Sequence, residues 1–93
     1  RVLFRSRFGG KADQRITVHK SCALAAQTFM LSIAAEGYES CPMEGFDSKR
    51  VKKALQLPAG AEINMIIAVG KATKEGIWGP RLRVPYEEVV FEK

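Results

Sequence analysis

Residues 13–36 form a long stretch without glycine or proline, and this stretch limits what the chain can fold into. It is rich in Ala, Leu, Met and Gln, which favour a helix, and Gly37 follows as the expected C-cap. At about 1.5 Å per residue the helix exceeds 30 Å in length. Residues 22–35 are apolar on nearly every side, so the helix needs cover on several faces. A chain of 93 residues supplies little of that cover, and we expect a partner or a further segment.

Small side chains recur along one side of this predicted helix at spacings of four and three residues. Such a stripe lets another backbone approach closely. The sequence leaves two interpretations open: a seam at a subunit interface, or packing on the chain's own sheet. The residues of the stripe are Ser21, Ala25, Thr28, Ser32 and Ala35.

Fifteen basic and ten acidic residues give a net charge of +5, but the cations are dispersed. The one crowded group falls in a predicted short helix, residues 48–55, which Asp47 caps, and indicates a solvated helix face rather than a nucleic-acid site. This group comprises Lys49, Arg50, Lys52 and Lys53. The uncharged run 21–35 is shorter than the roughly 20 apolar residues of a membrane span, so we expect a soluble protein that does not bind membranes.

Cys22 and Cys41 lie nineteen residues apart, outside any CxxC motif. The spacing predicts neither a disulfide framework nor a zinc site, and a reducing, cytoplasmic setting fits best. We expect no metal centre.

Further along the chain, residues 38–41 are a short extended candidate and residues 58–61 a turn. Residues 62–70, rich in Ile and Val, predict a buried central strand. A glycine-containing loop with Trp78 spans residues 71–80. The β-branched and aromatic run 89–91 is a candidate for a terminal strand.

No ordinary catalytic set is present in the sequence. The single histidine, His19, has no nucleophile nearby in the sequence and is predicted to be a surface residue. The chain also lacks GxGxxG and GxxxxGK[ST] motifs. If the chain belongs to an enzyme, a cofactor performs the chemistry.

Two segments have the composition of ligand contacts. In residues 41–47, CPMEGFD, a proline and a glycine frame a tight connection that can leave backbone N–H groups pointing outward. In residues 80–85, PRLRVP, Arg81 and Arg83 stand two positions apart between prolines. In an extended segment they project to the same side and can grip a phosphate. The alternatives are an ordinary turn and a pair of surface cations.

The order of these pieces resembles the carboxy-terminal half of the FMN-dependent nitroreductase family. The pieces are a long apolar helix ending AAEGYES, then CPMEGFD, a basic helix ending LQLP, a strand ending AVG, Trp78 and RLRVPYEEVV. The resemblance covers residues 13–93. Residues 1–12 are expected to be a truncated or foreign start, and Arg5-Ser6-Arg7 is not assigned to the family's amino-terminal phosphate motif. That motif is expected upstream.

The resemblance implies an α+β fold, a nitroreductase-like α-β-α sandwich with a mixed sheet, of which this chain is a carboxy-terminal fragment. It also implies an intertwined homodimer with FMN at each interface. Pro42 and Met43 would pack on the isoalloxazine ring, and the N–H groups of Glu44 and Gly45 would reach its N5 and O4 edge. Arg81 and Arg83 match the family's phosphate contacts, Arg83 more closely because the family often has lysine at the other position.

The implied function is an FMN-dependent NAD(P)H oxidoreductase, with ping-pong hydride transfer through flavin N5 to nitroaromatic, quinone or similar small-molecule acceptors. No side chain is assigned a catalytic role, and the fragment alone is expected to be inactive. Two alternatives stay open. One is a specialised flavin enzyme of the same superfamily, such as a dehalogenase or a flavin-consuming enzyme, and the other is a small basic binding module without a cofactor.

Overall fold

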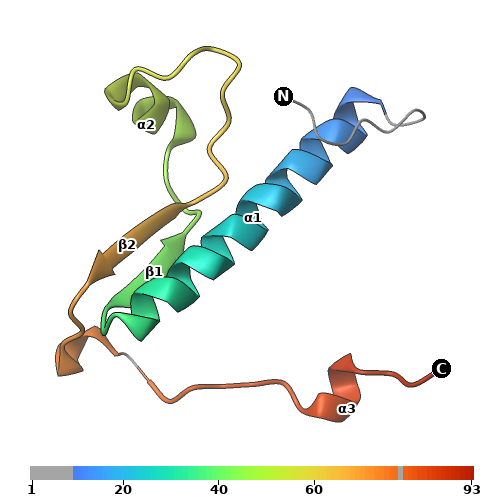
Figure 1. Cartoon of the computed structure of the whole chain (residues 1–93), viewed down its shortest axis with the longest axis vertical. Coiled ribbons are helices and arrows are strands. Elements are labelled where there is room, and N and C mark those ends of the chain that lie inside the picture. Colours follow the sequence, from blue (N-terminus) through green and yellow to red (C-terminus); the bar gives the residue numbers. More distant parts are fainter. Residues whose placement is uncertain (1–9, 78) are drawn as a thin grey trace.

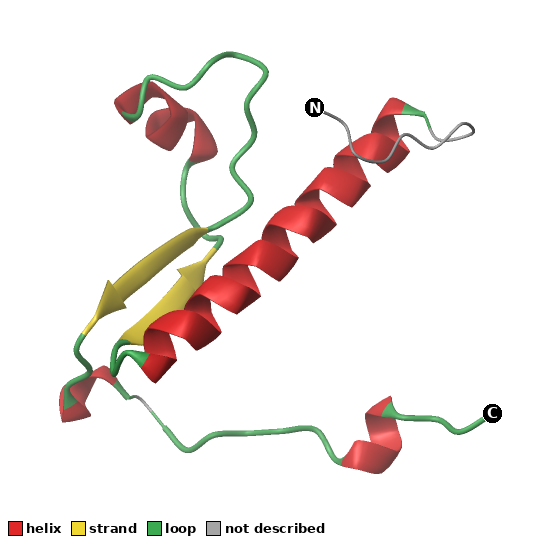
Figure 2. Cartoon of the chain, viewed as in Figure 1, coloured by secondary structure: helices red, strands yellow, loops and turns green. Residues whose placement is uncertain are grey.

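The computed structural model describes residues 10–77 and 79–93, so the expectations for residues 1–9 and for Trp78 lie outside it. A long helix lies along a two-stranded sheet, and a carboxy-terminal arm leads away from both (Figure 1). The α+β class is confirmed, with one long helix beside a small antiparallel sheet (Figure 2). The elements are α1 (Lys11–Ala35), β1 (Glu39–Met43), α2 (Ser48–Ala54), β2 (Ile66–Gly70), the 3-10 turn η1 (Lys74–Gly76) and α3 (Tyr86–Val89).

Helix α1 ends where the sequence predicts, because Gly37 takes a left-handed conformation with φ +85°. The N–H of Gly37 donates to the carbonyl of Ala34 at 3.0 Å, and the N–H of Tyr38 donates to that of Ile33 at 3.0 Å. This pair of bonds is the Schellman arrangement, which satisfies the last carbonyls of a helix. The chain then turns directly into β1.

One face of α1 covers the sheet, and the small-residue stripe is not on it. The half-buried side chains are His19, Ala26, Met30 and Ile33, at helical spacing. All five residues of the predicted stripe are exposed. Packing on the chain's own sheet is therefore the wrong interpretation of the stripe.

Strands β1 and β2 pair antiparallel, with Glu39 opposite Gly70 at one end and Met43 opposite Ile66 at the other. The strand predicted over residues 62–70 is real only from Ile66, because β1 ends at Met43 and leaves residues 62–65 without a strand to pair with. The prediction that this strand is buried is also wrong. Both strands are half-buried or exposed, because α1 covers only one side of the sheet.

Helix α2 follows the predicted capping. The Asp47 carboxylate accepts hydrogen bonds from the N–H groups of Lys49 at 3.1 Å and Arg50 at 3.3 Å. The helix ends in a second Schellman arrangement, here with Gln56 at φ 55°. The predicted turn at residues 58–61 is confirmed by a hydrogen bond from the N–H of Ala61 to the carbonyl of Pro58.

The predicted terminal strand at residues 89–91 is wrong at its start, because Val89 closes the short helix α3. Pro85 enters this helix with φ −56°, and Glu87 and Glu88 occupy the first turn, where negative side chains favour the helix dipole. The β-branched run has no neighbouring strand to pair with in the described part of the chain.

The chain has little interior. It exposes 9177 Å², whereas a compact monomer of 10.3 kDa exposes roughly 5400 Å². The radius of gyration is 17.3 Å, against about 12 Å for a compact domain of this length. No described residue is fully buried. Within the described residues, no helix is both long enough and apolar enough to cross a bilayer.

Candidate functional site

Pro42 and Met43 are the last two residues of β1 and pair with Ile67 and Ile66. Pro42 lacks an N–H and cannot donate to a neighbouring strand, which is tolerated at a sheet edge. The Met43 side chain is 40% exposed. These two side chains therefore offer an apolar surface at the end of the sheet.

Glu44 and Gly45 connect β1 to the cap of α2. Neither backbone N–H donates a hydrogen bond within the part of the chain that the structure describes. A Cβ built on Gly45 meets no atom within 4 Å, so the space beside this backbone is open. The backbone of Gly45 is not left-handed, and glycine is not required there by the fold. The loop thus presents free donors beside room for a ligand.

Asp47 holds the far side of this loop, because its carboxylate caps α2. The loop is therefore anchored by the β1–β2 ladder on one side and by a capped helix on the other. Two fixed ends keep the intervening N–H groups in one place, which a site for a flat ligand requires.

Arg81 and Arg83 lie on the arm between η1 and α3. Residues 80–85 carry neither helix nor strand, as the flanking prolines predict. The Nη1 atom of Arg83 donates to the carbonyl of Leu82 at 3.0 Å. Neither arginine forms an ion pair with a described carboxylate, so both charges remain available for an anion.

The structure brings four of the six predicted site residues together and leaves the two arginines apart. Pro42, Met43, Glu44 and Gly45 are consecutive at the Met43–Ile66 end of the hairpin. The arm with Arg81 and Arg83 departs beyond Gly70, at the opposite end (Figure 1).

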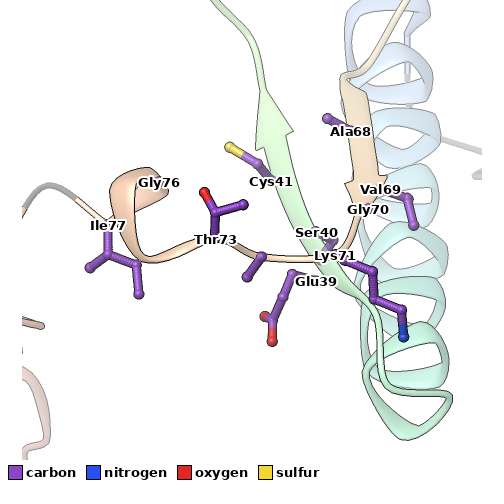
Figure 3. A pocket seen from close by; sticks show the side chains of 11 residues that line it. Glu39, Ser40, Cys41, Ala68, Val69, Gly70, Lys71, Thr73, Gly76 and Ile77 are labelled. Carbon is purple, nitrogen blue, oxygen red and sulfur yellow. The ribbon is translucent and has the colours of Figure 1, made fainter.

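An open groove of about 570 Å³ lies at the Gly70 end of the hairpin, where the sequence predicted no site (Figure 3). Its lining includes Glu39, Cys41, Thr73 and Ile77. The Lys71 side chain turns away toward the end of α1, where its Nζ donates to the Gly37 carbonyl at 3.1 Å and lies 4.3 Å from the Tyr38 ring centroid. Lys71 therefore holds the end of α1.

A cluster of polar side chains that sequence reasoning missed joins α1 to residues 62–64. The Nε of Arg15 donates to both carboxylate oxygens of Glu62, at 2.6 and 2.9 Å. The Nδ2 of Asn64 lies 2.9 Å from the His19 Nδ1. The His19 side chain is 31% exposed, so it lies at the surface as predicted, although it is half-buried against Asn64. These contacts join residues that lie 47 and 45 positions apart in the sequence, and no local sequence motif predicts contacts over such separations.

The Arg15 guanidinium hydrogen-bonds to Glu62 and lowers the pKa of that carboxyl. The same bond raises the pKa of Arg15. Both side chains remain largely solvated, so the pair is a tether on the surface rather than a buried charge site.

Comparison with known proteins gives one consistent answer. The model of the nitroreductase family matches residues 2–71. Protein DrgA of Synechocystis is 42% identical over 69 residues, which are 73% of this chain and 33% of that protein. MhqN of Bacillus subtilis, named as an NAD(P)H nitroreductase, is 35% identical over 81 residues, or 87% of this chain and 39% of that protein.

Solved structures agree with the sequence comparison. The crystal structure of ydfN from Bacillus subtilis, described as a nitroreductase, superposes with a TM-score of 0.83 at 36% identity. The match covers 90% of this chain and 41% of that one. The chain thus spans about a third of the length of the curated relatives it matches. On the family model and on this structural likeness, the chain belongs to the nitroreductase family.

Proposed function

We propose that this chain is the carboxy-terminal part of a longer FMN-dependent NAD(P)H oxidoreductase, which we call the intact enzyme. The observation that carries the proposal is the Glu44–Gly45 loop, with its two free N–H groups and open space beside Gly45. Membership of the nitroreductase family and the NAD(P)H nitroreductase name of one relative support it.

The described residues fit the ring of FMN. Pro42 and Met43 supply an apolar surface for one face of the isoalloxazine. The N–H groups of Glu44 and Gly45 are donors suited to the ring's N5 and O4 acceptors, and donors at that edge favour the electron-rich reduced ring. When bound, FMN would accept a hydride from NAD(P)H and pass it to a second substrate. The loop's task is to fix the ring so that each substrate in turn is held at reacting distance.

Arg81 and Arg83 fit the phosphate of the same cofactor. FMN carries its phosphate at the end of an extended ribityl chain, remote from the ring, so separate segments of the chain can bind the ring and the phosphate. An arginine can bind a phosphate through two parallel N–H donors. Arg83 is the principal contact in this proposal.

We propose that the intact enzyme works as a homodimer. The exposed stripe of small residues on α1, together with the exposed apolar side chains of Leu24, Phe29 and Leu31, supports a second helix packing on that face. Exposed apolar surface of this extent usually marks an interface. Electron-poor small molecules such as nitroaromatics and quinones are the proposed acceptors, reduced in a ping-pong cycle, and the cytoplasm is the proposed setting.

The proposal is tested by the absorbance spectrum of the intact enzyme as purified. Bound oxidised flavin gives a yellow protein, and anaerobic addition of NADH or NADPH should bleach it. Adding a quinone should then restore the colour. An intact enzyme that is colourless and takes up no FMN when incubated with it would contradict the proposal.

A further inference from the structure

Residues 62–64 are fastened to α1 by four side chains that come from two distant parts of the sequence. Besides the Arg15–Glu62 ion pair, Asn64 Nδ2 lies 2.9 Å from His19 Nδ1 and donates to the His19 carbonyl at 3.2 Å. The His19 Nε2 lies 3.8 Å from the Glu62 carboxylate. These contacts hold the segment that leads into β2.

The Asn64 contact requires a particular protonation state of His19. An amide nitrogen only donates, so Nδ1 must offer its lone pair, and the ring proton then sits on Nε2, facing Glu62. A protonated ring carries an N–H on Nδ1, directed at the Asn64 amide hydrogens. Turning the amide over would place Oδ1 beside the His19 carbonyl, and two acceptors repel. The hydrogen bond is therefore made only to the neutral ring.

Asn64 has no alternative arrangement of equal quality. Its Oδ1 is buried and has no hydrogen-bond partner in the described part of the chain. A buried polar atom without a partner already costs free energy. Losing the contact to Nδ1 as well would leave the amide with only its hydrogen bond to the His19 carbonyl. The position of Asn64 therefore depends on His19.

Several charges act on the His19 ring. Glu62 favours the protonated ring, but its carboxylate is already paired with Arg15. Arg15 and Lys20, which line the same open depression of α1 as His19, oppose protonation. Protonating the His19 ring thus adds a weakened attraction to Glu62 and removes the hydrogen bond between Asn64 Nδ2 and His19 Nδ1.

The cluster lies close to the candidate flavin loop along the chain. Asn64 precedes Ile66 by two residues, and Ile66 pairs with Met43, the residue before Glu44. The Met43–Ile66 pair thus connects residues 62–65 to the loop. We propose that His19 and Asn64 are positioning residues for the Glu44–Gly45 loop, and that they hold it only while the His19 ring is neutral. This inference rests on the proposed function.

The test is carried out on the intact enzyme between pH 8 and pH 5.5, the range in which imidazole side chains gain a proton. FMN dissociation is measured by flavin fluorescence, with hydrogen exchange of the amides of the β1–β2 ladder as a readout that needs no flavin. His19→Asn is the informative variant, because the asparagine oxygen replaces Nδ1 as an acceptor but cannot titrate. Asn64→Ala removes the donor, and Lys20→Gln is the control for a nearby change of charge.

In the wild type, FMN affinity should fall roughly three- to tenfold on acidification, the scale of one lost hydrogen bond. The exchange of the ladder amides should quicken relative to His19→Asn. The His19→Asn variant should lose less affinity than the wild type, because there only the titration of the FMN phosphate remains. Asn64→Ala should bind weakly throughout, with the same smaller dependence on pH. Lys20→Gln should retain a pH step, because it leaves the His19–Asn64 hydrogen bond in place.

Identical pH profiles for the wild type and His19→Asn in both readouts would overturn the positioning role. Failure of the proposed function can be distinguished from failure of the positioning role. In that case no variant binds FMN at any pH, while the exchange readout still shows whether His19 controls the loop.

Discussion

Arg15 donates from Nε to both carboxylate oxygens of Glu62, and this ion pair joins the first turns of α1 to the segment before β2. The hydrogen bond lowers the pKa of Glu62. A carboxyl whose pKa is lower in the folded state contributes stability above its unfolded pKa. That contribution is lost as the pH falls through the lowered folded value.

The first prediction concerns how the stability contributed by Glu62 depends on pH. Between pH 7 and pH 3, the urea midpoint of the intact enzyme should fall slightly more in the wild type than in Glu62→Gln, because only the wild type has this contribution to lose. The effect should be small, since both side chains are solvated. Glu92→Gln, at an exposed position, is the control and should behave as the wild type does. Equal pH slopes for Glu62→Gln and the wild type would show that the pair is not formed.

The second prediction concerns the end of α1. Gly37→Ala should lower the free energy of unfolding of the intact enzyme by about 1 kcal/mol, because a side chain at φ +85° is strained. Gly60→Ala is the matched control, since its backbone is not left-handed and the space around it is open. Denaturant unfolding measures both, and a Gly37→Ala variant as stable as Gly60→Ala would refute the assigned cap.

The third prediction separates flavin contact from folding at Gly45. Gly45→Val should fold normally, because neither the backbone angle nor a neighbouring atom forbids a side chain there. Its FMN affinity or its rate of reduction by NAD(P)H should nevertheless drop, since the valine fills the space proposed for the ring. Gly60→Val, equally open, should leave both unchanged. Full FMN occupancy with normal turnover in Gly45→Val would place the ring elsewhere.

The local signals in the sequence were sufficient for much of this fold. The start of α2 follows from Asp47 and the end of α1 from Gly37, because a cap depends on residues only a few positions away. The predictions of a strand at residues 62–65 and of a terminal strand at residues 89–91 were wrong for the opposite reason. Whether an apolar run becomes a strand depends on a partner strand, and neither run has one among the described residues.

The sequence likewise predicted only part of the candidate site. The loop at Glu44 and Gly45 could be recognised from consecutive residues and from the family resemblance. The His19–Asn64 contact could not, because it joins positions 45 apart and depends on how α1 lies on the sheet. The separation of Arg83 from the loop also needed the structure, since it follows from the strand register.

The fourth prediction concerns the arm. Removing residues 88–93 should weaken or abolish the proposed dimer of the intact enzyme, because Val89 and Phe91 are exposed apolar side chains on a segment that leads away from its own sheet (Figure 1). Analytical ultracentrifugation measures the association, and removal of residues 92–93 alone is the control. A dimer of unchanged stability without residues 88–93 would show that the arm does not reach the partner.

The most direct test of the proposed flavin site compares FMN with riboflavin, which lacks the phosphate, in wild-type and Arg83→Ala forms of the intact enzyme. Arg83→Ala should weaken FMN binding roughly ten- to a hundredfold, the scale of one or two hydrogen bonds to a charged group. Arg83→Lys should restore only part of the loss, because it keeps the charge without the planar fork. Riboflavin should bind the wild type and Arg83→Ala almost equally. If riboflavin binding falls as far as FMN binding, Arg83 supports the fold and the phosphate assignment is wrong.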